Sequence, residues 1–184
     1  RLKTQAAKES LLRRVRRQRL NYITILPSLV TILNGICGFA AIVFASKGAA
    51  AVSYHKITLP YFAMAGYMIL LAMIADVLDG RLARMSKNTS SFGGQLDSIC
   101  DIISFGVAPA FLMLKVLEYK LSSDPEQSLS LVNFLQRFIW LAAASYISCA
   151  AIRLARFNVE NEEDESAHMS FVGLPTPAAA GVVV

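Results

Sequence analysis

The sequence predicts an all-α integral membrane protein built as a polytopic helical bundle, and three observations support this prediction. Of the 184 residues, 55% are hydrophobic and 17% are charged, whereas soluble domains carry about a quarter charged residues. Several stretches without charge approach or exceed the roughly 20 residues that a helix needs to cross the hydrocarbon core. Basic residues gather near the N-terminus, as beside a membrane surface. An ordinary soluble globule is therefore not expected.

The predicted spans follow one another along the chain. The first lies within 27 uncharged residues between Arg19 and Lys47, and the second within 19 between Lys56 and Asp76. A fifth apolar stretch begins near Gly173 and is still running where the chain stops. Because the chain also begins without Met, we expect both ends to be cut. The apolar stretches are 20–46, 57–75, 94–114, 138–152 and 173–184.

Lys and Arg are distributed unequally between the two sides that alternating spans define. The side with residues 1–22, 80–93 and 153–172 carries 13 of them, and the other side carries five. Cytoplasmic loops hold the excess of Lys and Arg, which predicts a cytoplasmic N-terminus and a cytoplasmic 80–93 loop. Residues 1–22 are predicted to form a basic segment beside the membrane domain, 23–184. That segment is either an interfacial helix on anionic lipid or a loosely structured topology signal.

Four aspartates at the cytoplasmic ends of the second and third spans form the candidate site. Asp76 and Asp79 are three residues apart, Asp97 and Asp101 are four apart, and both spacings place a pair on one helix face. The two spans are expected to be antiparallel neighbours, so the pairs can face each other. One Asp at the centre of a span costs about 2.5–3.5 kcal/mol on insertion scales, which makes such residues functional candidates.

Converging carboxylates repel one another unless cations neutralise them. An all-oxygen site suits Mg²⁺ or Mn²⁺ rather than zinc, and two such ions are a recurrent device in phosphoryl chemistry. Gly80 and Gly93 let a ligand approach the backbone, Ala83 leaves room for a flat group, and Arg84 can hold a phosphate through two hydrogen bonds. We therefore expect a diphosphate between two divalent cations and an arginine.

The complete pattern, DxxDGxxAR and then GxxxDxxxD after eight residues, fixes eight positions over 26 residues. It resembles the signature of the CDP-alcohol phosphotransferase family, and the resemblance covers about residues 24–184. It implies a homodimer with six transmembrane helices, the sixth lying beyond Val184. It also implies that Asp76, Asp79 and Asp97 bind the metals, with Asp101 near the second metal and acting as the general base. The residues predicted to contact the CDP-linked lipid are Asp76, Gly80, Ala83, Arg84, Ser90, Gly93, Thr31 and Asn34.

Three further stretches resemble the membrane-embedded phosphatidylserine synthases of this family. They are 26–38, 153–158 and 171–180. This resemblance implies CDP-diacylglycerol and L-serine as substrates, phosphatidylserine and CMP as products, and a location in the cytoplasmic membrane with the site facing the cytoplasm. Arg153, Arg156 and Asn158 would bind serine, because its carboxylate needs a cation.

Each of these assignments has an alternative. Arg153 and Arg156 can instead be anchors at the cytoplasmic interface, and Thr31 and Asn34 can bond to backbone within a helix. Choline, glycerol 3-phosphate or an inositol phosphate can replace serine as the acceptor. A cation transporter is a function of another class, but a pathway would need polar groups at the midplane, and all four aspartates are predicted toward one face. Membrane lipids are expected partners, and nucleic acid is not.

Overall fold

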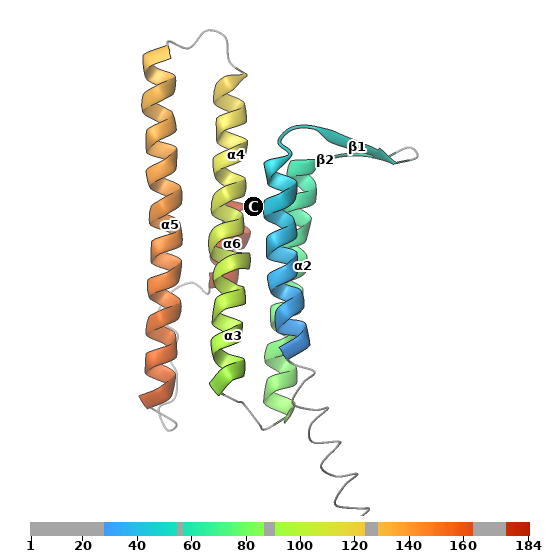
Figure 1. Ribbon diagram of the computed structural model, residues 1–184, viewed down its shortest axis with the longest axis vertical. Helices are drawn as coiled ribbons and strands as arrows, with labels where there is room; N and C mark the ends of the chain where they lie inside the picture. Colours follow the sequence, from blue (N-terminus) through green and yellow to red (C-terminus); the bar gives the residue numbers. More distant parts are fainter. Residues whose placement is uncertain (1–27, 55–56, 87–90, 124–128, 164–175) are drawn as a thin grey trace, which may run out of the picture.

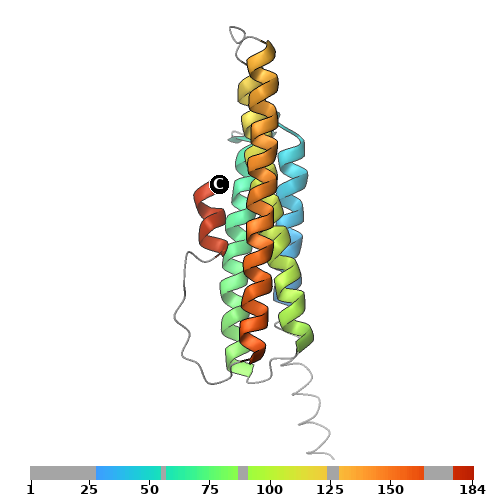
Figure 2. The ribbon, with the colours of Figure 1, turned by 90° about the vertical axis from the view of Figure 1, so that its left-hand side faces the viewer.

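The structure, a computed structural model, describes residues 28–54, 57–86, 91–123, 129–163 and 176–184 (Figure 1). Long helices run side by side through an elongated bundle, as Figures 1 and 2 both show. The prediction of a helical, multi-pass membrane protein is confirmed, the count of six helices stays a prediction, and the basic segment 1–22 lies outside the described residues. Within these described ranges, four helices are long and apolar enough to cross a membrane, namely Ser28–Ser46, Tyr61–Leu82, Phe92–Ser122 and Ser130–Val159.

The Ser28–Ser46 helix is amphipathic in the sense that a membrane protein requires, with small or polar residues inside and large apolar residues outside. After Ser46 the chain turns at Gly48, whose φ of 70° favours glycine. The buried face carries Thr31, Asn34, Cys37, Gly38, Ala41 and Ala45. The face left for lipid carries Leu29, Ile32, Leu33, Ile36, Phe39 and Val43.

A short β-hairpin joins this helix to α2 (Tyr61–Ser86). Its strands, β1 (Ala51–Tyr54) and β2 (Ile57–Pro60), pair antiparallel, with Ala51 opposite Pro60. This hairpin is not predicted from the sequence. In the turn that precedes the hairpin, the ammonium of Lys47 lies 4.9 Å from the ring centroid of Tyr61, an arrangement suited to cation–π attraction at an interface.

One continuous helical rod follows, made of α3 (Ser91–Asp101), the π-helical segment η1 (Ile102–Val107) and α4 (Ala108–Ser122). Pro109, in the first turn of α4, has no N–H to donate to the carbonyl of Phe105 four residues earlier. The hydroxyl of Tyr146 donates to that carbonyl oxygen at 3.0 Å. Tyr146 lies on α5 (Leu129–Glu163), so this bond ties α5 to the middle of the rod.

The core is built mainly from alanine, which lets helix backbones approach closely where lipid supplies no hydrophobic driving force between helices. α5 packs against α4 and η1 on one side of the rod, and the short helix α6 (Thr176–Val183) contacts α2, α4 and η1 (Figure 2). The main core cluster comprises Cys37, Ala41, Ala45, Ala65, Ile69, Ala72, Phe105, Ala108, Leu112 and Ala180.

Candidate functional site

Three of the four predicted aspartates meet between α2 and α3. The end of α2 and the start of α3 lie together at one end of the bundle (Figure 1). One carboxylate oxygen each from Asp76, Asp97 and Asp101 lies within 4.8 Å of the other two. Asp76 and Asp97 are half-buried, and Asp101 is 8% exposed. The predicted meeting of the two spans through their carboxylates is therefore confirmed for three residues.

The fourth aspartate, Asp79, lies outside this group of three. It is 5% exposed, and its carboxylate is hydrogen-bonded to the side chain of Thr31 on the first helix. Asp76 and Asp79 share a helix face as predicted, but they lie about one helical turn apart along the axis of α2. The structure thus supports a three-aspartate cluster, and a site with four aspartate ligands stays a proposal.

The cluster has the composition of a site for a hard divalent cation. Two unit charges about 4.8 Å apart repel by roughly 3.5 kcal/mol at an effective dielectric constant near 20, so three ionised carboxylates need a counter-charge. Opposite ligands of one Mg²⁺ ion lie about 4 Å apart, close to the observed limit of 4.8 Å. The donor set and its spacing therefore fit such a cation.

Buried oxygens around the cluster give independent support for a missing positive charge or donor. Within the described residues, Asn34 Oδ1, Asp79 Oδ2 and Asp97 Oδ1 are buried and have no hydrogen-bond partner. A buried polar atom left without a partner costs about 1–3 kcal/mol, and more when it is charged. Each of these three atoms could accept a bond from a cation or a hydrogen-bond donor at the cluster.

The glycines and the arginine of the motif surround the cluster along the chain. Gly80 follows Asp79 directly, and a Cβ added there would meet nothing within 4 Å. Gly93 lies one helical turn before Asp97 in α3, while Ala83 and Arg84 lie in the last turn of α2. The contacts predicted for Gly80, Ala83, Arg84 and Gly93 with a nucleotide stay predictions, and Ser90 lies outside the described residues.

Asn158, predicted to bind the acceptor, links α5 to α3. Its Nδ2 donates to Ser98 Oγ at 2.9 Å, and Ser98 is the neighbour of Asp97 on α3. Arg153 and Arg156 lie on the same end of α5, half-buried and exposed respectively. The structure thus brings these residues to the cluster's end of the bundle, but their role in binding an acceptor stays a prediction.

Two serines, Ser98 and Ser104, make contacts near the cluster and are not among the residues predicted from the sequence. Ser98 fastens α3 to α5, and Ser104 Oγ donates to the backbone carbonyl oxygen of Asn34 at 2.9 Å. Both serines lie on the rod that carries Asp97 and Asp101. Their positions inside a predicted span, within one turn of an aspartate, were the signal that could have identified them.

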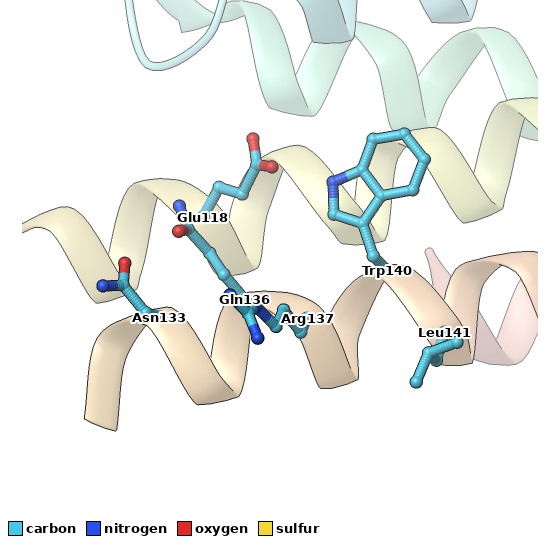
Figure 3. Close-up of a pocket in the computed structure, with 6 residues that line it drawn as sticks. All are labelled: Glu118, Asn133, Gln136, Arg137, Trp140 and Leu141. Atoms are coloured by element: carbon cyan, nitrogen blue, oxygen red, sulfur yellow. The ribbon is translucent and has the colours of Figure 1, made fainter. Parts of the chain in front are cut away.

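A hollow between α4 and α5 lies near the opposite end of the bundle and is not part of this cluster. Glu118 comes from α4, and in Figure 3 the indole of Trp140 projects from α5 toward α4. Glu118 also accepts a hydrogen bond from Lys115 Nζ at 3.0 Å. The remaining residues that line the hollow are Asn133, Gln136, Arg137 and Leu141.

Comparison with known proteins points to the same chemistry as the motif. CDP-diacylglycerol–serine O-phosphatidyltransferase of Helicobacter pylori (strain 26695) is 34% identical over 165 residues, which are 90% of this chain and 58% of that protein. The proteins with the same name from Saccharomyces cerevisiae and Methanocaldococcus jannaschii are 34% and 38% identical, over 84% and 64% of this chain and 50% and 47% of their own lengths. The chain thus spans about half the length of the curated relatives it matches.

No solved structure matches the chain. The family model described as CDP-alcohol phosphatidyltransferase matches residues 24–184, a range that contains the aspartate cluster, the motif glycines and all four membrane-capable helices. From this match, the signature pattern and the relatives together, the chain belongs to the CDP-alcohol phosphatidyltransferase family.

Proposed function

We propose that this protein transfers the phosphatidyl group of CDP-diacylglycerol to the hydroxyl of L-serine, producing phosphatidylserine and CMP. The single observation that carries the chemistry is the meeting of Asp76, Asp97 and Asp101 within 4.8 Å of one another. Serine as the acceptor rests on the names of the relatives from three organisms.

Asp76, Asp79 and Asp97, with Asp101 beside them, would hold two divalent cations, Mg²⁺ or Mn²⁺. Such ions, when bound, offset the negative charge of the diphosphate and of the phosphorus centre under attack. The unpartnered oxygens of Asp79 and Asp97 support this assignment. Arg84 would add a guanidinium to the diphosphate, and Gly80 and Gly93 would leave room for the nucleotide.

Asp101 would act as the general base. The serine hydroxyl oxygen forms a bond to the phosphorus that carries the diacylglycerol, its proton passes to the Asp101 carboxylate, and the bond from that phosphorus to the CMP oxygen breaks. Asp101 is shielded from solvent, with 8% of the residue exposed. This supports its role as the base, because water competes less for the carboxylate. Arg153 and Arg156 would hold the serine carboxylate.

We further propose that the site faces the cytoplasm and that the enzyme is a homodimer in the cytoplasmic membrane. The excess of Lys and Arg on the side that contains the motif supports this orientation. The basic segment 1–22 would lie beside the membrane domain, 23–184, on the same side. Lipid tails would then leave the site sideways into the bilayer while the nucleotide stays at the surface.

Gly80→Ala tests the nucleotide's approach to α2. The added methyl group meets nothing within 4 Å in the protein, and alanine favours a helix by about 0.5–1 kcal/mol over glycine, so thermal stability should not fall. We expect kcat/KM for CDP-diacylglycerol to fall about 10–100-fold, because displacing a substrate slightly can cost that much. Gly94→Ala, equally unobstructed, is the matched control. Equal rates for the two variants would contradict a nucleotide at Gly80.

CMP release by the purified protein with CDP-diacylglycerol tests the function itself. We expect release with serine and Mg²⁺ or Mn²⁺, its loss in EDTA, and its recovery when the metal is returned. Choline, glycerol 3-phosphate and an inositol phosphate are offered separately. Release with one of these and not with serine would retain the phosphotransferase reaction and reject the serine assignment. Full activity in EDTA would reject the metal site.

A further inference from the structure

The first helix contributes polar side chains to the aspartate cluster although it carries no residue of the DxxDG or GxxxDxxxD pattern. Thr31 and Asn34 lie one helical turn apart on its buried face. Thr31 is hydrogen-bonded to Asp79 on α2, and Asn34 Nδ2 donates to Asp101 Oδ1 at 2.9 Å. One helix face thus contacts an aspartate on each of the two motif helices.

Asn34 is held more firmly than a residue that merely lines a pocket. None of it is exposed, and its backbone carbonyl oxygen accepts a hydrogen bond from Ser104 Oγ at 2.9 Å. The neighbouring Gly35 packs against Cys100, where an added Cβ would lie 3.0 Å from the sulfur. Neighbours of Asp101 along the rod therefore pack against the backbone of the first helix at residues 34 and 35, whereas the side-chain amide of Asn34 makes its own hydrogen bond to Asp101.

We propose that Asn34 is a positioning residue for Asp101, an inference that rests on the proposed transferase function. Its amide N–H engages Oδ1 of the carboxylate, so Oδ2 is the oxygen presented to the acceptor hydroxyl and the one that receives its proton. A group that fixes a base in this way lowers the cost of reaching the reactive geometry.

The negative charges of the aspartate cluster explain why the side chain at position 34 is an amide. An ionised carboxylate only accepts hydrogen bonds, so it needs a donor, and an amide supplies one without adding charge to a centre built for divalent cations. The other end of the amide, Oδ1, is buried without a hydrogen-bond partner in the described part of the chain. That oxygen can accept a hydrogen bond from a group that arrives with the substrates, which would hold the amide in the same orientation.

Three variants of Asn34 separate positioning from packing and from nucleotide binding. Asn34→Leu removes the hydrogen-bond donor and keeps a similar side-chain volume. Asn34→Ala also removes the donor, and its smaller side chain avoids steric strain with the neighbouring residues. Asn34→Gln keeps the amide. Ser104→Ala is the matched control, because it removes a buried hydrogen bond to the same residue without removing a direct hydrogen bond to Asp101. CMP release with serine, both KM values and thermal stability are measured for each protein, including the unchanged chain.

We expect kcat to fall about 10–100-fold in Asn34→Leu and Asn34→Ala, with both KM values within about threefold of those of the unchanged chain. Asn34→Gln should recover part of the loss, and Ser104→Ala should stay within about threefold in kcat. A raised KM for CDP-diacylglycerol with kcat retained would overturn the proposal and assign Asn34 to the nucleotide pocket. Equal losses in Ser104→Ala and Asn34→Ala that follow thermal stability would overturn it in favour of packing.

The unchanged chain distinguishes failure of this inference from failure of the proposed function. If it releases CMP with serine and the Asn34 variants match it, the positioning role is wrong and the transferase function stands. If it releases no CMP with any acceptor, the proposed function is wrong, and the positioning role is rejected with it.

Discussion

Replacing Asp101 with asparagine is expected to lower CMP release by about 10²–10⁴-fold, the share that a positioned general base contributes. The two side chains have the same shape, so a residue that is 8% exposed can be exchanged without a cavity. The new side chain can still accept the hydrogen bond that Asn34 Nδ2 donates at 2.9 Å to Oδ1. Its NH₂ group then stands where Oδ2 was, and an amide cannot take the proton of the acceptor hydroxyl.

Glu118→Gln is the matched control for this variant. Glu118 lies on the same continuous rod, near the hollow at the other end of the bundle, and pairs with Lys115 at 3.0 Å. Loss of such a partly exposed pair costs about 0–1 kcal/mol, so its turnover should match that of the unchanged chain. Rates of CMP release and thermal unfolding are compared for both variants. Full turnover in a folded Asp101→Asn protein would exclude Asp101 as the base.

The sequence was sufficient to predict where the cluster forms, because helical periodicity acts locally. Asp97 and Asp101 both lie in α3, ahead of the π-helical segment, so the ordinary spacing of four residues places them on one face. Asp76 then meets them because α2 and α3 are joined by a short connection. Helical spacing also places Asp79 on the same face of α2 as Asp76. It does not show that Asp79 lies outside the cluster of three, where Thr31 on the first helix is hydrogen-bonded to it.

Features that depend on contacts between distant segments were not predictable from spacing. The π-helical segment beyond Asp101 lies beside Tyr146, which bonds to the carbonyl of Phe105, 41 residues away in the chain. The resemblance of residues 153–158 to the family predicts that Asn158 binds the acceptor, but it does not predict a contact of Asn158 with another helix. Its partner, Ser98, depends on how α5 packs against α3, and no local pattern encodes that packing.

The first helix packs closely against the rod at Gly38, so a single added methyl group should have a large effect. A Cβ added at Gly38 would lie 2.7 Å from the Cα of Ser104 and 2.5 Å from its Oγ. A side chain can turn away, but a backbone Cα moves only if the helices separate. Overpacking of this kind typically costs 1–3 kcal/mol, and occasionally more. We therefore expect Gly38→Ala to lower the thermal stability of the protein clearly, and Gly38→Leu to abolish its folded state.

The same displacement should reduce activity, because it acts on the helix that carries Asn34 and on the rod that carries Asp101. Gly94→Ala adds the same methyl group to a helix where nothing lies within 4 Å, and it should leave melting temperature and CMP release nearly unchanged. The double variant Gly38→Ala/Ser104→Gly removes the hydroxyl and Cβ of Ser104 but keeps its Cα, so stability should recover only in part. A Gly38→Ala protein as stable as Gly94→Ala would mean that the first helix and η1 do not pack this closely.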